Sequence, residues 1–203
     1  MKKIVVVGAT GKLGKDVVEG LEADYEVIRA SRSGPDLKID AFVFESVSDI
    51  FSSIGSFDGL VSCIGTAPFK PFDELSMEDF TSGLSTKCLS QLNLAKAAIP
   101  FLTENGSITL TSGIIGDEPI LGGAVAAAAN GALNMCVSIL AAEYAGKLRI
   151  NIVSPSIIEN SVEHYGMLFD GFEPTSKESI IQAYRRTISA PISGRVLCQT
   201  RSL

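Results

Sequence analysis

The N-terminal segment most constrains the fold, because an apolar run leads directly into a glycine-rich turn and then into a helical pattern. Residues 4–7 are Ile-Val-Val-Val, and glycines follow at positions 8, 11 and 14. A strand that ends in such a turn and continues as a helix directs backbone N–H groups and the positive end of the helix dipole at one point. That point suits a pyrophosphate, and the glycine spacing is a variant of the dinucleotide-binding motif.

The rest of the chain alternates strand-like and helix-like runs, with no repeat or low-complexity linker. Strands are predicted at 3–8, 25–30, 37–40, 58–63, 106–111, 148–153 and 195–199. Helices are predicted at 11–23, 46–54, 76–102, 122–145 and 176–189. Continuous apolar runs such as 4–7 are typical of strands covered on both faces. We therefore expect one α/β domain over residues 1–203, a doubly wound, mainly parallel Rossmann-type sheet of about seven strands with helices on both faces.

Composition limits the partners. The 203 residues are 46% hydrophobic, which is enough apolar chain for one domain with a sizeable core. The formal net charge of −6 argues against nonspecific binding to nucleic acid or to an anionic membrane, because both need a basic surface. We therefore expect a small-molecule ligand, no nucleic acid and no membrane.

The cysteines and the hydropathy pattern indicate a compartment. Cysteines stand far apart at 63, 88, 136 and 198, with no Cys-x-x-Cys pair, which predicts small reduced side chains and neither disulfides nor metal ligands. The apolar run before Gly8 is too short for a targeting segment, so we expect a cytoplasmic protein. Residues 120–142 carry no charge, but their glycines and asparagines favour a helix packed inside a soluble protein.

The end of the second predicted strand indicates which dinucleotide binds. An acidic residue there reads a free ribose 2′-OH, whereas a 2′-phosphate needs a cation and small hydroxyls. This chain has Ser31-Arg32-Ser33, and Lys12 in the glycine turn can approach the same group. The pattern therefore predicts NADP(H). The alternative is that Arg32 is an ordinary solvated loop residue.

Further motifs follow at the ends of the later strands. They are Asp40-Ala41, Ser62-Cys63-Ile64-Gly65, Thr111-Ser112-Gly113, Ser154-Pro155-Ser156 and Ser193-Gly194-Arg195-Val196. In this order, over essentially the whole chain, they resemble the motifs of the short-chain dehydrogenase/reductase superfamily. The resemblance implies that Asp40 contacts adenine, that Pro155 lies beside the nicotinamide and that Ser112 is the catalytic serine. The alternative for Ser112 is a strand-end hydroxyl that caps the local backbone. The cofactor residues predicted in all are Gly8, Thr10, Gly11, Lys12, Leu13, Gly14, Ser31, Arg32, Asp40, Ala41, Cys63, Ile64, Gly65, Asn130 and Pro155.

Two departures from the family bear on the mechanism. In the family, a tyrosine and a lysine four residues later share one face of the helix after the serine, and they move the proton and hold the nicotinamide ribose. Aligning residues 130–133 with the family's Lys-Gly-Ala-Leu segment places Ala126 and Asn130 at these two positions. Asn130 can still bond a ribose hydroxyl. Ala126 has no proton to give, and a positioned general acid typically contributes about 10²–10⁴-fold to the rate.

Other side chains are candidates for the missing acid. Lys87 falls near the family's helix asparagine, and with a lowered pKa it can act as the acid; the alternative is a solvated or paired lysine. His164 and Tyr165 lie in residues 156–175, which the family uses as a substrate lid, but their default role is packing or surface exposure. Tyr144 lies about five helical turns from position 126, so helix packing is its expected role.

Two functions remain open. The first is an NADP(H)-dependent enzyme acting on a small carbonyl or alcohol, with Ser112 polarising the oxygen and Lys87 and Asn130 as further catalytic candidates. The second is a module that binds NADP(H) as a sensor or structural partner without chemistry. The helices at 76–102 and 122–145 resemble those through which family members pair, so a homodimer or homotetramer is expected, with a monomer as the competing view.

Overall fold

Seven parallel strands form one sheet in the computed structural model, which describes residues 1–199. The last four residues of the predicted domain, 200–203, lie outside the described part. The strands are β1 (Lys3–Val7), β2 (Glu26–Ser31), β3 (Leu37–Lys38), β4 (Phe57–Ser62), β5 (Leu102–Thr111), β6 (Arg149–Pro155) and β7 (Val196–Gln199). Their order is β3-β2-β1-β4-β5-β6-β7, and every pairing is parallel. This confirms the predicted doubly wound fold class.

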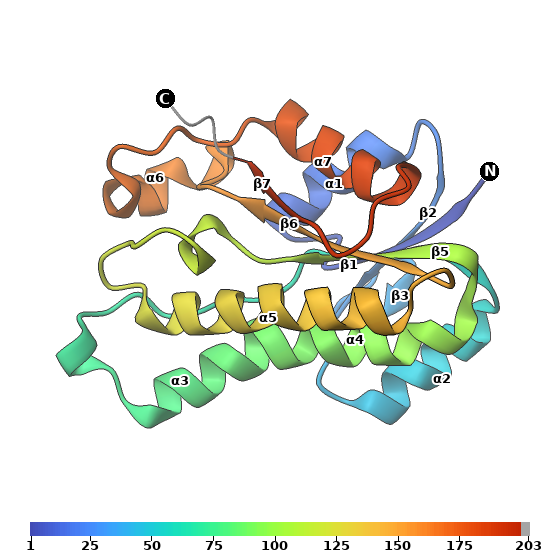
Figure 1. The fold of residues 1–203 in the computed structure, drawn as a ribbon, viewed down its shortest axis with the longest axis horizontal. Coiled ribbons are helices and arrows are strands. Elements are labelled where there is room, and N and C mark those ends of the chain that lie inside the picture. The colour runs from blue at the N-terminus through green and yellow to red at the C-terminus, as the bar shows by residue number, and fades with distance from the viewer. Residues whose placement is uncertain (200–203) are drawn as a thin grey trace.

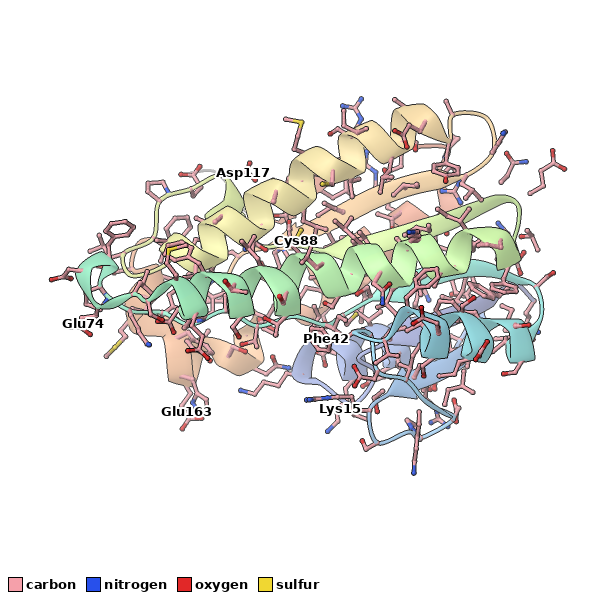
Figure 2. All side chains as sticks on the ribbon, turned by 90° about the horizontal axis from the view of Figure 1, so that it is seen from below. Lys15, Phe42, Glu74, Cys88, Asp117 and Glu163 are labelled. Carbon is pink, nitrogen blue, oxygen red and sulfur yellow. The ribbon has the colours of Figure 1, made fainter. Side chains whose placement is uncertain are left out.

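Helices cover both faces of the sheet, as the apolar strands predicted (Figure 1). They are α1 (Lys12–Leu21), α2 (Phe44–Ile54), α3 (Met77–Leu84), α4 (Ser90–Ala98), α5 (Ala124–Glu143), α6 (Val162–Tyr165) and α7 (Lys177–Ser189). Helices α1 and α7 pack on one face, and α2, α4 and α5 on the other. Figure 2 looks onto the face where α3, α4 and α5 lie.

The N-terminal run shows why two layers of helices are needed. Side chains alternate between the two faces of a strand, so Val5 and Val7 enter one core while Ile4 and Val6 enter the other. All four side chains are buried, and burying each contributes about 1.5–3 kcal/mol. A helix layer missing from either face would leave half of this strand in water.

The predicted helix at 76–102 is corrected by the structure. It is interrupted by a π-helical turn, η2 (Ser85–Leu89), and it ends in a 3-10 turn at Ile99–Phe101 that contains Pro100. Strand β5 then begins at Leu102 and not at 106. Proline cannot continue the ladder of helical hydrogen bonds, so the chain leaves the helix before the predicted end.

Helix α5 is long and apolar enough to cross a membrane by length and composition, and it is the one such helix within residues 1–199. In its most apolar window, 39% of the residues are buried. Its buried side chains include Val125, Leu133 and Val137, which face α3, β6 and the turn η2. One side of α5 therefore packs into the core on this face of the sheet, and its other side is exposed to solvent.

Candidate functional site

The glycine turn after β1 lies at the carboxyl edge of the sheet, between β2 and β4. Gly8 has a left-handed φ of +88°, and the N–H groups of Gly8 and Ala9 both donate to the Ala30 carbonyl, at 2.9 and 3.2 Å. A Cβ on Gly14 would stand 2.0 Å from the Gly8 carbonyl oxygen. Only glycine therefore lets α1 approach the end of β1 this closely.

This geometry fits the pyrophosphate of a dinucleotide. Helix α1 has Gly11 as its N-cap, with no side-chain cap, so the first N–H groups of the helix keep their capacity to donate. Together with the helix dipole they favour an anion at this point. Thr10, Gly11 and Lys12 are exposed there, which is the arrangement expected of the predicted cofactor residues.

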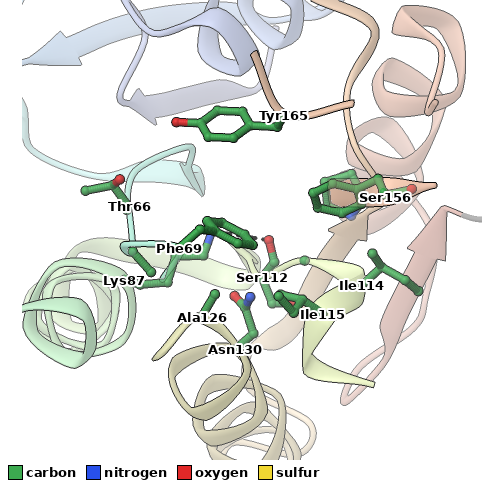
Figure 3. Close-up of a pocket in the computed structure, with 15 residues that line it drawn as sticks. Thr66, Phe69, Lys87, Ser112, Ile114, Ile115, Ala126, Asn130, Ser156 and Tyr165 are labelled. Carbon is green, nitrogen blue, oxygen red and sulfur yellow. Dashed lines mark hydrogen bonds between the residues drawn. The ribbon is translucent and has the colours of Figure 1, made fainter. Parts of the chain in front are cut away.

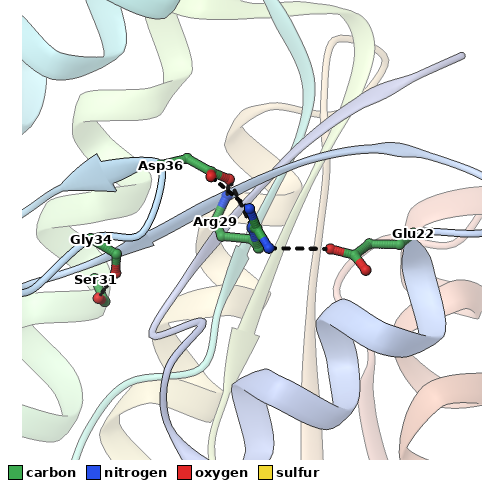
Figure 4. A network of polar contacts seen from close by, with 5 residues as sticks. All are labelled: Glu22, Arg29, Ser31, Gly34 and Asp36. Carbon is green, nitrogen blue, oxygen red and sulfur yellow. Dashed lines mark hydrogen bonds and ion pairs between the residues drawn. The ribbon is translucent and has the colours of Figure 1, made fainter.

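Arg32 is exposed just after β2, where a ribose phosphate of the cofactor is expected. Ser31 is buried, and its hydroxyl donates to the Gly34 carbonyl (Figure 4). Arg29 is paired with Asp36, whose pKa the Arg29 hydrogen bond lowers, so this second arginine is already engaged. Arg32, the residue that follows β2, has no ion-pair partner within residues 1–199 and can therefore bind a phosphate, while the Ser31 hydroxyl is held inside its own turn.

Lys12 has a different neighbour from the one expected. Its Nζ donates to the Asn160 carbonyl at 2.9 Å, and Asn160 Nδ2 donates to Asp16 Oδ2 at 3.0 Å. Lys12 and Asp16 are four residues apart and share one face of α1. They hold residues 156–175, the predicted lid, against the glycine turn of residues 8–14, which we call the cofactor turn.

The residues predicted to contact adenine, Asp40 and Ala41, lie in the loop after β3. Asp40 is exposed and its Oδ1 accepts from the Phe42 N–H at 3.1 Å, while Ala41 is buried. Asn93 on α4 donates to the Ala41 carbonyl at 2.7 Å. This contact ties the loop after β3 to α4 and fixes the height of Asp40 above the sheet.

The turn after β4 brings the cofactor edge and helix η2 together. The Cys63 N–H donates to the Val7 carbonyl at 2.7 Å, and a Cβ on Gly65 would stand 2.6 Å from Lys87 Cδ. Burial raises the pKa of the Cys63 thiol to about 12, so this cysteine stays neutral. Gly65 is required because the side chain of Lys87 passes directly over it.

A cavity of about 220 Å³ opens beside this turn, and Ser112 lies in it (Figure 3). We call it the Ser112 cavity. It is lined by Gly65, Thr66, Ala67, Phe69, Lys87, Ser112, Gly113, Ile114, Ile115, Ala126, Asn130, Pro155, Ser156, Tyr165 and Phe169. The structure thus gathers all three catalytic candidates, Lys87, Ser112 and Asn130, in one place.

Lys87 enters the Ser112 cavity from the π-helical turn η2. Its Nζ donates to the Ser112 carbonyl oxygen at 3.2 Å. Burial lowers the pKa of Lys87 to about 8, and the nearby Cys63 only partly opposes this shift. A lysine with a pKa near the working pH can hold a proton and give it up.

Ser112 and Asn130 bring unpaired polar atoms to the same cavity. Both residues are 3% exposed, and Ser112 Oγ and Asn130 Oδ1 have no hydrogen-bond partner among the described residues. Such buried groups normally have a partner, so they fit a bound carbonyl and a ribose hydroxyl. Ala126 lies one turn before Asn130 and shows only a methyl group to the cavity.

Gln91 supports this arrangement, and the sequence reasoning missed it. It is fully buried on α4, one turn after Lys87, and its amide bonds both backbone groups of Thr111, at 2.7 and 2.9 Å. Its Nε2 also donates to the Lys87 carbonyl at 2.8 Å. Gln91 therefore joins η2 to the end of β5 just before Ser112. No sequence signal pointed to this role, because Ser90, Asn93 and Lys96 make the surrounding helix as polar as Gln91 itself.

Three aromatic side chains line the Ser112 cavity together with Lys87. The Phe69 ring lies 6.0 Å from Tyr165 and 6.4 Å from Phe169, measured between centroids. Figure 3 shows the Tyr165 ring above Ser112. His164 is exposed and does not line the cavity, and Tyr144 packs against the core at the other end of α5.

A family model described as enoyl-(acyl carrier protein) reductase matches residues 2–187. Senescence-associated protein 13 of Arabidopsis thaliana is 34% identical over 116 residues, which are 56% of this chain and 42% of the relative. A chloroplastic tropinone reductase homolog of the same plant is 28% identical over 173 residues, 77% of this chain and 53% of the relative. The chain thus spans about half the length of these curated relatives.

Solved structures are similar over nearly the whole chain. The protein lin1944 from Listeria innocua is 35% identical, covers 98% of this chain and 99% of its own, and has a TM-score of 0.93. A small-chain dehydrogenase in complex with NADPH is 26% identical, with coverages of 97% and 95% and a TM-score of 0.87. Together with the matched family model, these similarities show that the chain belongs to the short-chain dehydrogenase/reductase superfamily.

Proposed function

We propose that this chain is an NADP(H)-dependent oxidoreductase that transfers a hydride to or from a small carbonyl or alcohol, with Lys87 as the proton donor. One observation carries the proposal. Lys87 reaches the cavity of the Ser112 hydroxyl, which has no partner within residues 1–199, and the Lys87 Nζ stands 3.2 Å from the Ser112 carbonyl oxygen. Reduction of a carbonyl to an alcohol needs a hydrogen-bond donor that polarises the oxygen and a group that gives it a proton. The Ser112 hydroxyl and the Lys87 ammonium can supply these two.

Each residue then has one task in the reduction. A bound reduced nicotinamide supplies the hydride to the carbonyl carbon. Ser112 Oγ donates a hydrogen bond to the substrate oxygen and stabilises the charge that develops there. Lys87 gives that oxygen a proton from Nζ, becomes neutral and regains a proton from water. Asn130 bonds a ribose hydroxyl and orients the nicotinamide.

The preference for NADP(H) rests on Arg32. It is exposed after β2 and, within the described part of the chain, forms no ion pair such as that of Arg29 with Asp36. A similar small-chain dehydrogenase was solved in complex with NADPH. Arg32→Ala is expected to weaken NADPH binding about tenfold or more and to leave NADH binding unchanged, because one charge-assisted contact is lost. Lys147→Ala, an exposed site at the other edge of the sheet, is the control. Equal effects on both dinucleotides would contradict the role of Arg32.

The enzyme assay follows NADPH oxidation with a panel of carbonyl compounds. Lys87→Met and Ser112→Ala should each lower the turnover number by about 10²–10⁴-fold, while the exposed Lys15→Met retains it. In the wild type, the rate of reduction should fall as the pH rises above about 8, because the donor must be protonated. Full turnover in Lys87→Met would rule out this donor.

Ala126 at the family's tyrosine position favours a second candidate, a module that binds NADP(H) without chemistry. The same experiment separates the two. Tight NADPH binding with no turnover across the panel would support the module. Turnover that depends on Lys87 would support the enzyme.

We also propose a homodimer formed through α4 and α5. The exposed side of α5 carries Ala128, Ala132, Met135 and Ile139, which follow one another at intervals of three or four and so share one stripe. Met135 and Ile139 are 66% and 54% exposed. Small residues at two of these positions allow a second helix to approach closely.

A further inference from the structure

The charge balance of the Ser112 cavity is unusual. Lys87 is the one cation that lines it, and no Asp or Glu lines it among residues 1–199. Within the same residues Lys87 forms no ion pair, and its one hydrogen bond goes to a neutral backbone carbonyl. An ammonium group has three N–H donors, so two of them remain for a ligand.

An ammonium in this position is costly for the fold. Removing a charge from water without an opposing charge is unfavourable. The fold carries this cost because Gly65 and Gln91 hold Lys87 in place, one by making room and the other by bonding its carbonyl. A ligand that brings a negative charge would remove the cost.

The neighbouring groups are also suited to an anion. Ser112 Oγ and Ser156 Oγ belong to side chains that are 3% and 6% exposed, and neither oxygen has a partner among the described residues. Both hydroxyls can donate. The cavity therefore presents one cation from η2 and two hydroxyl groups, one on the residue after β5 and one at the start of the lid.

The opposite wall has the contrary character. Phe69, Tyr165 and Phe169 form an aromatic wall. Ile114 and Ile115 add apolar surface on the side of Ser112 and Asn130. In Figure 3 the Tyr165 ring lies above Lys87, Ser112 and Asn130. A ligand that fits both walls has a charged end and an apolar or aromatic end, and it is small, since the whole cavity measures about 220 Å³.

We infer that the substrate is a small 2-oxo acid, or the corresponding 2-hydroxy acid, with an apolar or aromatic substituent. Its carboxylate binds Lys87 and its substituent lies under the aromatic wall. This inference rests on the proposed function for the reaction itself. In a 2-oxo acid the carbonyl oxygen adjoins a carboxylate oxygen, so two N–H groups of one ammonium can reach both. Lys87 thereby holds the anion and stands ready to protonate the carbonyl.

Calorimetric titration tests the binding without turnover. The probes are phenylglyoxylate and its neutral methyl ester, added to protein saturated with NADP⁺, which cannot reduce them. At pH 7 the acid should bind at least about tenfold more tightly than the ester. Raising the pH to 9.5 should weaken acid binding about tenfold or more and leave the ester unchanged, because the free lysine has lost its proton.

Two variants separate this inference from the proposed function. Lys87→Met should abolish the preference for the acid. Lys87→Arg keeps the charge but does not release a proton in this pH range, so it should keep the preference within about threefold and lose turnover with NADPH. Equal binding of acid and ester by the wild type, or a preference that survives Lys87→Met, would overturn the inference. If Lys87→Arg retained turnover, the donor role would fall while the anion site stood.

Discussion

At the scale of single residues, Lys87 lowers the stability of the fold while it supplies the charge that the proposed function needs. The fold places an ammonium where burial lowers its pKa to about 8 from an ordinary value of 10.5. The folded state therefore binds this proton less tightly than the unfolded chain does. Below pH 8 both states are charged, and the folded state carries the full penalty.

Lys87→Met is accordingly expected to stabilise the protein. At pH 7 the free energy of unfolding should rise by about 1–3 kcal/mol, measured by urea denaturation without cofactor. The gain should shrink as the pH rises from about 8 to 10.5, where the wild-type lysine becomes neutral in both states. The exposed Lys15→Met is the control and should change little. If Lys87→Met were less stable than the wild type, burial of the ammonium would not be what lowers the stability of the folded state.

Two helical glycines give a matched pair. A Cβ on Gly14 would meet the Gly8 carbonyl oxygen at 2.0 Å, whereas a Cβ on Gly131 has its nearest contact at 3.9 Å, the Gly116 carbonyl. Gly14→Ala should therefore destabilise the protein by about 2 kcal/mol or more and weaken NADPH binding. Gly131→Ala should be neutral or stabilise by up to about 1 kcal/mol. Urea denaturation measures the change in stability, and titration with NADPH measures the change in binding. Equal effects of Gly14→Ala and Gly131→Ala would contradict the close contact between Gly14 and the Gly8 carbonyl oxygen.

At the scale of elements, the π-helical turn η2 decides where the cation enters. A π turn adds one residue to a helix and is often found at functional sites. Here it lies between α3 and α4. The Gln91 amide donates to the Lys87 carbonyl in this turn and also bonds the N–H and the carbonyl of Thr111 at the end of β5. The position of Lys87 relative to Ser112 therefore depends on this one buried amide.

Gln91→Leu is expected to cost about 2–4 kcal/mol of stability, since it leaves the buried Thr111 N–H and carbonyl without their partner. The turnover number should fall, and the pH at which the rate declines should move, because Lys87 loses its fixed environment. A purely structural role would lower stability without moving the pH profile. Gln182→Leu, an exposed site on α7, is the control for both measurements.

At the scale of the whole molecule, one side of α5 leaves the apolar side chains of Met135 and Ile139 exposed in the monomer. Met135→Lys should shift the elution of a homodimer to that of a monomer, because a charge on the stripe opposes burial against a second copy. Met167→Lys, at another exposed methionine in the lid segment, should leave elution unchanged. Sedimentation of the wild type as a monomer at micromolar concentration would contradict the proposed interface.

Much of the architecture followed from local pattern. The run Ile4–Val7 and the glycines after it predicted β1, the turn and α1, because strand and helix periods and the need for close approach are written in adjacent residues. The spacing of the later motifs predicted seven strands in a parallel sheet. The boundary of β5 escaped prediction because Pro100 stopped the helix early.

The sequence by itself determined the fold class and the glycine turn, since both are written in neighbouring residues, while the candidates Ser112, Lys87 and Asn130 came from the positions they hold in the family resemblance. Only the tertiary structure decided that Lys87, from η2, points at Ser112 across the sheet edge, and that Lys12 holds the lid at Asn160. It also revealed Gln91 and the aromatic wall. The physical reason is distance along the chain: Lys87 and Ser112 are 25 residues apart, and Lys12 and Asn160 are 148 apart. Contacts of that kind, and the pKa that burial imposes on Lys87, exist only once the elements have packed.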